Sequence, residues 1–252
     1  MKVVILAGGF GSRIFEYTKK IPKPMIKIAN KPILEHIINI FSSQFYTDFL
    51  IATGYKKNLI EEYFKNFNIS EDKYLLKNSS TLVKIQFVNT GLKTMTGGRL
   101  RRLADHLKNE KDFMFTYGDG LSNVNLEKLE IFHSRNKNLA TVTAVRPLSR
   151  YGVLKIKGRS VTSFKEKQAI NNSWINGGFF IFNKNIFNYI KNDKTVLEGT
   201  PLETLVRKKK LNAFKHNGFW HSIDTKRDKE KLENIIRKTR LLPWMQTKSL
   251  KK

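Results

Sequence analysis

The chain has 252 residues, a formal net charge of +26 and no cysteine, and these values narrow the kind of protein it can be. A chain of this length can bury one substantial core, so we expect one domain over residues 1–244 and a basic tail over residues 245–252. Without cysteine, disulfides, thiolate zinc sites and cysteine nucleophiles are excluded. No apolar run approaches the ~20 residues of a membrane span and no signal-peptide pattern opens the chain. We therefore expect a cytoplasmic protein with no membrane partner.

The positive charge raises the alternative of a nucleic-acid binder. Lysines are spread through nearly every segment, and no expected helix carries a basic stripe interleaved with aromatic side chains. We expect most of this charge to lie on solvated faces, and we predict no specific nucleic-acid partner.

Short apolar strands alternate with amphipathic helical segments through the first half of the chain, which is typical of a mostly parallel sheet with helices on both faces. Asn30 is expected to cap a helix that begins at Pro32. Residues 66–80 are polar and poorly periodic, which predicts a loop. The expected strands cover residues 2–6, 48–53, 83–88, 113–117 and 140–145, and further helices are expected over residues 57–67, 99–107 and 126–135.

From residue 151 the pattern changes to two short strands over residues 153–157 and 161–165, joined by Gly158 and Arg159. The sequence therefore predicts an α/β fold whose mostly parallel sheet carries helices on both faces and a small antiparallel insertion. The remaining expected elements are a strand over residues 174–182, helices near residues 185–190 and 202–209, a strand near residues 211–215 and a terminal helix from Lys226.

The stretch Leu6-Ala7-Gly8-Gly9-Phe10-Gly11-Ser12-Arg13 directly follows the first strand and is the most informative feature of the chain. Its glycines let the backbone turn sharply and present N–H groups to an anion. Arg13 supplies a planar fork of donors, and Lys23, in Pro22-Lys23-Pro24-Met25, supplies a compact positive charge. The Walker pattern is absent, and Ile14 stands where a dinucleotide fold would place Gly or Ala. A tight turn without a ligand is the alternative, but Arg13 and Lys23 favour a polyphosphate site.

Two aspartates are candidates for holding a metal ion near this turn. Asp119 follows the strand that ends near Tyr117, so its carboxylate is expected at the carboxyl edge of the sheet, where α/β sheets bind ligands. Mg²⁺ takes one or two carboxylates and completes its shell with water and phosphate oxygens, so Asp224 would suffice as the second ligand. The alternatives are a turn residue at Asp119 and a helix cap at Asp224, ahead of Lys226.

The glycine turn together with Pro22-Lys23-Pro24-Met25 resembles the signature of the sugar-phosphate nucleotidyltransferases, which join a nucleoside triphosphate to a sugar 1-phosphate and release pyrophosphate. Further blocks resemble those of glucose-1-phosphate cytidylyltransferases in the same order, and the similarity extends from Met1 to Trp244. These blocks are Val88-Asn89-Thr90-Gly91, Met95-Thr96-Gly97-Gly98-Arg99-Leu100, Tyr117-Gly118-Asp119-Gly120, Ile175-Asn176-Gly177-Gly178-Phe179-Phe180 and Gly218-Phe219-Trp220.

This resemblance implies a Rossmann-like nucleotide-diphospho-sugar transferase sheet, CTP and glucose 1-phosphate as substrates, Mg²⁺ as cofactor and a homo-oligomer. It assigns catalysis to Arg13, Lys23 and Asp119, and Mg²⁺ binding to Asp119 and Asp224. The sugar-phosphate side would consist of Glu166, Lys167, Asn176 and Gly177. The nucleotide side would consist of Leu6, Ala7, Gly8, Gly9, Phe10, Gly11, Ser12, Arg13, Lys23, Thr94, Gly97, Gly98, Arg99 and Gly118.

The sequence also departs from the cytidylyltransferase pattern. Residues 66–82 are fewer than in the corresponding region and lack a tryptophan-containing stretch, and Gln168 replaces a proline. Two alternatives therefore stay open: a transferase for another base or sugar, such as UTP or dTTP, and a non-catalytic binder of sugar nucleotides or nucleic acid.

Overall fold

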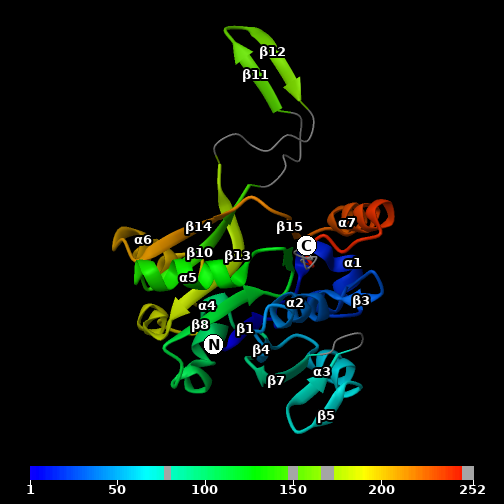
Figure 1. The fold of residues 1–252 in the computed structure, drawn as a ribbon, viewed down its shortest axis with the longest axis vertical. Helices are drawn as coiled ribbons and strands as arrows, with labels where there is room; N and C mark the ends of the chain where they lie inside the picture. Colours follow the sequence, from blue (N-terminus) through cyan, green and yellow to red (C-terminus); the bar gives the residue numbers. More distant parts are fainter. Residues whose placement is uncertain (77–80, 147–152, 166–172, 246–252) are drawn as a thin grey trace, which may run out of the picture.

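The computed structural model describes residues 1–76, 81–146, 153–165 and 173–245. Its centre is a nine-stranded sheet with the strand order β14-β10-β13-β8-β1-β4-β7-β6-β5 (Figure 1). All of these strands run in one direction except β6 and β13, so the predicted mostly parallel sheet is confirmed. The strands are β1 (Val3–Leu6), β4 (Asp48–Thr53), β5 (Asn68–Ser70), β6 (Lys73–Leu75), β7 (Leu82–Asn89), β8 (Asp112–Tyr117), β10 (Ala140–Val145), β13 (Ile175–Asn183) and β14 (Leu211–His216).

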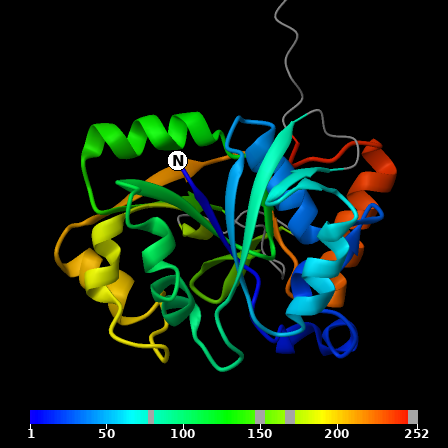
Figure 2. The ribbon, with the colours of Figure 1, turned by 90° about the horizontal axis from the view of Figure 1, so that it is seen from below.

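Apolar side chains cover both faces of the sheet, because successive side chains of a strand point to opposite sides. In β1, Val3 and Ile5 belong to one buried cluster, while Val4 and Leu6 belong to another. Figure 2 shows helices on both faces, as predicted. The first cluster is completed by α2 (Ile33–Ser42), α3 (Lys57–Lys65), α5 (Leu126–Asn136) and α7 (Lys226–Thr239). The second is completed by α4 (Thr96–Arg101), α6 (Thr200–Arg207) and the 3-10 helices η3 (Ala104–Leu107) and η4 (Lys184–Tyr189).

The strand order reverses at β1. This strand pairs with β4 on one side and with β8 on the other, both in parallel. The segments that follow the three strands therefore leave the sheet at one edge and diverge there. Open α/β sheets bind ligands at such a point, so the fold places the glycine turn after Leu6 at the expected binding edge.

The structure corrects several local predictions. Asn30 is not a helix cap: it lies at φ 65° in the turn between β2 (Lys27–Ile28) and β3 (Lys31–Pro32), and α2 begins at Ile33 without a side-chain cap. The helix expected over residues 99–107 begins earlier and divides into α4 and η3. The loop expected over residues 66–80 contains the strands β5 and β6, which extend the sheet beyond β7.

The predicted antiparallel insertion is the hairpin of β11 (Val153–Lys157) and β12 (Ser160–Lys165), which extends away from the large sheet in Figure 1. At the other end of the chain, Trp244 is buried and its ring meets that of His36 edge-on. No helix within the described ranges is long and apolar enough to cross a membrane.

Candidate functional site

A cavity of about 1470 Å³ lies at the carboxyl edge of the sheet. It is lined by the glycine turn after β1, by the segment after β7, by the end of β8, by the start of β13 and by one side of α7. Most of the residues predicted for the site line it. These are Leu6, Ala7, Gly9, Phe10, Gly11, Ser12, Arg13, Lys23, Thr94, Arg99, Gly118, Asp119, Asn176, Gly177 and Asp224.

The glycine turn is packed against the segment that carries Lys23. Gly11 adopts φ 65°, and a Cβ atom there would lie 2.8 Å from Thr18 Cγ2 and 3.0 Å from Lys23 Cβ. Both the left-handed backbone and this close approach require glycine at this position. The chain then forms η1 (Ser12–Ile14), α1 (Phe15–Thr18) and η2 (Lys23–Met25), which return it to the cavity.

Four charged side chains form what we name the open cluster: Arg13, Lys23, Asp119 and Asp224. The Lys23 ammonium donates to Asp119 Oδ2 at 2.6 Å and to Asp224 Oδ1 at 2.8 Å. Arg13 Nη1 lies 3.2 Å from the same Asp224 oxygen. The Lys23 side chain is only 11% exposed, whereas that of Arg13 is 74% exposed, so the cluster has a buried centre and an exposed cation at its rim.

A small antiparallel ladder brings the two aspartates together, although 104 positions separate them in the sequence. The strands β9 (Gly120–Ser122) and β15 (Trp220–Ser222) pair, and the Ile223 N–H donates to the Asp119 carbonyl at 3.0 Å. Asp224 does not cap α7, because Thr225 does so in a reciprocal pair with Asp228. The Asp224 carboxylate is therefore left to face Lys23.

The electrostatics of the open cluster favour its charged forms. Burial alone would lower the pKa of Lys23, but the charges and hydrogen bonds of Asp119 and Asp224 raise it above its ordinary value. Burial alone would raise the pKa of Asp224, but hydrogen bonding and charge from Lys23, with the charge of Arg13, hold it below its ordinary value. At neutral pH the cluster is a buried ammonium between two carboxylates.

Arg99 lies at the wall of the cavity, but its guanidinium forms hydrogen bonds with other residues of the protein. It is 4% exposed and donates to Thr90 Oγ1 at 2.7 Å and to the Gly91 carbonyl at 2.8 Å. Burial, with a smaller effect of the neighbouring Arg102 charge, lowers its pKa. Gly8 makes room for it, since a Cβ atom on Gly8 would lie 2.2 Å from Arg99 Nη1. Arg99 and Gly8 thus hold the segment after β7 against the glycine turn.

Gly97 and Gly98 do not line the cavity. A Cβ atom on Gly98 would lie 2.3 Å from the Asp193 carbonyl oxygen, and one on Gly97 would lie 2.8 Å from that of Thr195. These glycines were expected to face the nucleoside, and instead they let α4 approach the loop that precedes α6. Of the residues predicted for the nucleoside, Thr94 and Arg99 line the cavity.

Of the residues predicted to bind the sugar phosphate, Asn176 accepts a hydrogen bond from the Gly178 N–H at 2.8 Å, and the Gly177 carbonyl accepts one from Trp220 Nε1 at 2.7 Å. Gly118 passes close to β1, since a Cβ atom there would lie 2.6 Å from the Leu6 carbonyl oxygen. Glu166 and Lys167, the other two residues predicted here, lie outside the described residues.

The cavity residues that were not predicted include two groups from elements outside the predicted motifs. Glu198, in the loop before α6, receives hydrogen bonds from the side chains of Tyr117 and Thr96. Tyr117 and Thr96 lie within recognisable blocks, but Glu198 has no sequence signal, because only tertiary folding brings its loop to the cavity. The second group is one face of α7, which contributes Lys231, Asn234, Ile235 and Lys238.

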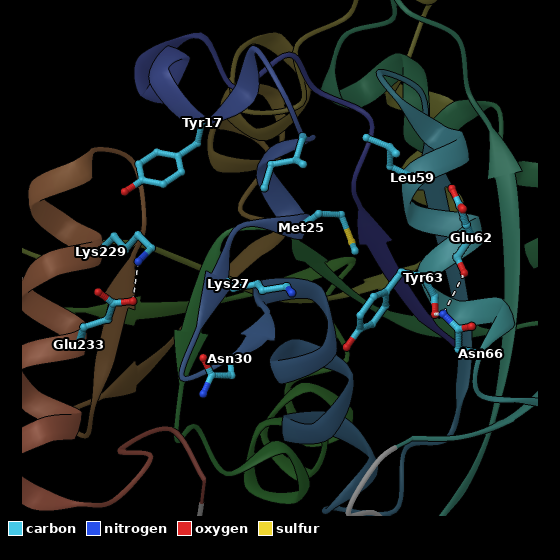
Figure 3. Close-up of a pocket in the computed structure, with 11 residues that line it drawn as sticks. Tyr17, Met25, Lys27, Asn30, Leu59, Glu62, Tyr63, Asn66, Lys229 and Glu233 are labelled. Atoms are coloured by element: carbon cyan, nitrogen blue, oxygen red, sulfur yellow. Dashed lines mark hydrogen bonds and ion pairs between the residues drawn. The ribbon is translucent and has the colours of Figure 1, made fainter.

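A second, smaller hollow of about 590 Å³ lies between α1, η2, α3 and α7 (Figure 3). Its floor is apolar and includes Tyr17, Met25 and Tyr63, and Lys27 points into it. None of the predicted site residues lines it, and no acidic side chain of the described residues pairs with Lys27. The cavity at the sheet edge, which holds the open cluster, is therefore the candidate active site.

Comparisons with known proteins identify the family of this chain. Residues 2–232 match the family model described as nucleotidyl transferase, and the chain belongs to this family. The glucose-1-phosphate cytidylyltransferase of Salmonella typhimurium is 41% identical, over 97% of this chain and 98% of its own length. The probable glucose-1-phosphate cytidylyltransferase of Bacillus subtilis is 38% identical, over 89% of this chain and 92% of its own.

Among solved structures, the crystal structure of HddC from Yersinia pseudotuberculosis is similar to this chain, with a TM-score of 0.70 and 25% sequence identity. The match covers 93% of this chain and 99% of that one. The fold class and the family resemblance predicted from the sequence are confirmed.

Proposed function

We propose that this protein transfers the cytidylyl group of CTP to glucose 1-phosphate, giving CDP-glucose and pyrophosphate. The observation that carries the proposal is the open cluster, in which a buried lysine between two carboxylates faces the cavity beside the glycine turn. The choice of CTP and glucose 1-phosphate is supported by the names of the relatives that match along nearly the whole chain.

The two carboxylates fit a divalent cation, which we propose to be Mg²⁺. Asp119 and Asp224 both reach the same ammonium nitrogen, at 2.6 and 2.8 Å, so they are close enough to share one cation. The described residues contain no group of three or more metal-ligand side chains. Mg²⁺ does not require one, because it binds one or two carboxylates and fills its shell with water and phosphate oxygens. When bound, it would neutralise charge on the phosphate groups of the substrates.

No nucleophile from the protein is needed for this chemistry. An oxygen of the sugar phosphate attacks the α-phosphorus of CTP, the bond to the bridging oxygen breaks, and pyrophosphate leaves with the electron pair. The chain has to hold the two substrates in line and stabilise the developing negative charge. We assign positioning of the triphosphate to Leu6 and the glycine turn after it.

Lys23 and Arg13 are assigned to charge stabilisation. The Lys23 ammonium has three N–H donors, and its two carboxylate partners leave one for a phosphate oxygen. Arg13 is exposed at the rim and presents several donors to the same region. Both side chains are preorganised around Asp224, which limits the reorganisation needed during the reaction.

The experiment that tests the proposal is pyrophosphate release with Mg²⁺ and glucose 1-phosphate, measured in parallel with CTP, UTP, dTTP, ATP and GTP. We expect release that requires both CTP and the sugar phosphate. Release with another nucleotide would keep the reaction and reject CTP as the donor. Absence of release with all five nucleotides would contradict the proposal.

A transferase for another base or sugar is the second candidate, and one observation favours it. The mannose-1-phosphate guanyltransferase of Gibberella zeae is 30% identical over 90% of this chain, although the match covers only 62% of that relative. The nucleotide panel separates the two candidates. A homo-oligomeric state and the absence of a nucleic-acid partner stay predictions, which sedimentation and duplex-DNA binding measurements would test.

A further inference from the structure

Hydrogen bonds and an ion pair hold the loop before α6 against α4 at the edge of the cavity. Arg102 donates through Nε and Nη2 to the two oxygens of Asp193, at 3.0 and 2.5 Å. The Met95 N–H donates to the Asp193 carbonyl at 2.9 Å, and the Gly98 N–H donates to the Thr195 carbonyl at 3.2 Å. Backbone and side-chain contacts together therefore fix the position of the residues that follow, including Glu198.

The Glu198 carboxylate is oriented by two neutral hydroxyl groups. Thr96 Oγ1 donates to Oε2 at 2.6 Å, and the Tyr117 hydroxyl donates to Oε1. Burial, followed by the charge of Glu198, raises the pKa of Tyr117, so this hydroxyl stays a proton donor at neutral pH. Thr96 also accepts from the Leu197 N–H at 2.9 Å, which ties the carboxylate to its own loop.

This carboxylate keeps unused acceptor capacity on the cavity side. An ionised carboxylate offers about four lone-pair positions. The contacts above use two of them, Glu198 lines the cavity, and no basic side chain in the described part of the chain forms an ion pair with it. A ligand that brings hydrogen-bond donors would therefore find an acceptor whose direction is already set.

The position of Glu198 identifies which part of the substrates it faces. The Tyr117 ring lies against the start of β13, where a Cβ atom on Gly178 would lie 2.9 Å from Tyr117 Cδ2, and Asn176 hydrogen-bonds the Tyr117 side chain. Glu198 is thus one side chain away from Asn176, which the family resemblance assigns to the sugar side. Arg99, three positions after Thr96, donates instead to the carbonyls of Gly91 and Leu92 in the segment after β7.

We infer that Glu198 accepts hydrogen bonds from hydroxyl groups of the hexose ring, and that it is a specificity-determining residue for the sugar 1-phosphate. A hexose presents several hydroxyl donors, and an acceptor that is held in place for one of them discriminates against analogues that lack it. Tyr117 and Thr96 are positioning residues, since they act on the sugar through Glu198. This inference rests on the proposed transferase reaction.

The test compares the wild type with Glu198→Gln, which keeps the size of the side chain and one acceptor oxygen. We expect kcat/KM for glucose 1-phosphate to fall about 10- to 100-fold, the effect of losing a hydrogen bond to a charged group, with little change in KM for CTP. The two proteins are then compared on the 2-, 3-, 4- and 6-deoxy analogues of glucose 1-phosphate. For the analogue that lacks the contacted hydroxyl, the substitution should cause no further loss, because the interaction is already absent.

The matched control is Glu203→Gln, an exposed glutamate five positions later on α6 that does not line the cavity. It should leave all kinetic values unchanged. Tyr117→Phe should raise KM for the sugar phosphate in the same direction as Glu198→Gln, by a smaller factor.

Two results would overturn the inference: equal losses for Glu198→Gln on all analogues, or a loss that appears only with CTP varied. Failure of the proposed function is a different result, since it would be absence of turnover by the wild type itself.

Discussion

The open cluster and a second charged group beneath the smaller hollow use similar residues for different purposes. In this second group, which we name the closed cluster, Glu35 is fully buried, Tyr63 donates its hydroxyl to Glu35 Oε2, and Lys31 Nζ lies 2.6 Å from Glu35 Oε1. The closed cluster has one carboxylate for one ammonium and does not open on the large cavity. The open cluster has two carboxylates around its buried lysine and faces a cavity of about 1470 Å³.

This difference shows how to tell a binding cluster from a structural one. A balanced, enclosed ion pair stabilises packing and leaves nothing for a ligand. Two carboxylates that share one lysine at a cavity wall keep further oxygen positions that can bind a cation. The lysine keeps an N–H donor that can bind an anion. Substitutions in the open cluster should therefore lower the activity, whereas substitutions in the closed cluster should lower the stability of the fold.

The largest expected effect is that of Lys23→Ala on turnover. It removes a preorganised donor from the reacting phosphates, so we expect kcat to fall by about two to three powers of ten. Pyrophosphate release measures this. Lys27→Ala is the matched control, because Lys27 lies on the neighbouring β2 and points into the smaller hollow (Figure 3). Near-wild-type turnover of Lys23→Ala would contradict the assignment of the active site.

In the closed cluster, Lys31→Met should reduce stability instead. The Oε1 atom of Glu35 forms no hydrogen bond within the described residues, so its charge depends on Lys31. Leaving that carboxylate buried without a counter-charge should lower the free energy of unfolding by about 3 kcal/mol, with kcat unchanged. Urea unfolding measures the loss, and Lys27→Met controls for the general effect of removing a lysine. A stable variant with low kcat would show that this cluster also serves the reaction.

Gly11→Ala tests whether the open cluster depends on the geometry of the glycine turn. The added methyl would press on Thr18 Cγ2 and Lys23 Cβ, at 2.8 and 3.0 Å, and displace the lysine. We expect a loss of about 10- to 100-fold in kcat/KM, as for small misplacements of reacting groups. Gly158→Ala is the control, since it has a similar φ of 60° but no atom within 4 Å. If both variants were equally active, close packing against Lys23 would be irrelevant to the reaction.

The smallest expected effect is the pH dependence of stability, compared between the wild type and Asp224→Asn. The lowered pKa of Asp224 gives stability that is present above the ordinary aspartate value, about 3.9, and is lost as the pH falls through the folded value. The raised pKa of Lys23 gives stability that is present below about 10.4 and is lost as the pH rises through the folded value.

The difference in unfolding free energy between the two proteins should therefore be constant from about pH 5 to 9 and should shrink below about pH 4. Chemical denaturation across this range measures it. A difference that grows on acidification would mean that the Asp224 carboxylate destabilises the folded state.

The sequence by itself determined the parallel sheet, the glycine turn and the family. Alternating apolar residues predict the strands because burial on a sheet face follows a period of two, and the turn after Leu6 needs only local backbone chemistry. The same local information indicated Lys23, Asp119 and Asp224 as site residues. It failed at Asn30, where a tight turn between two short strands replaced the expected cap, and at residues 66–80, where pairing with β7 formed strands that local periodicity did not indicate.

Only the tertiary structure decided which residues meet. The pairing of β9 with β15 placed Asp119 and Asp224 on one ammonium, and the contact of α4 with the loop before α6 took Gly97 and Gly98 away from the cavity. That same contact brought Glu198 to the cavity wall. Such contacts join segments about 100 residues apart along the chain, so their geometry follows from packing of the whole domain and leaves no local pattern in the sequence.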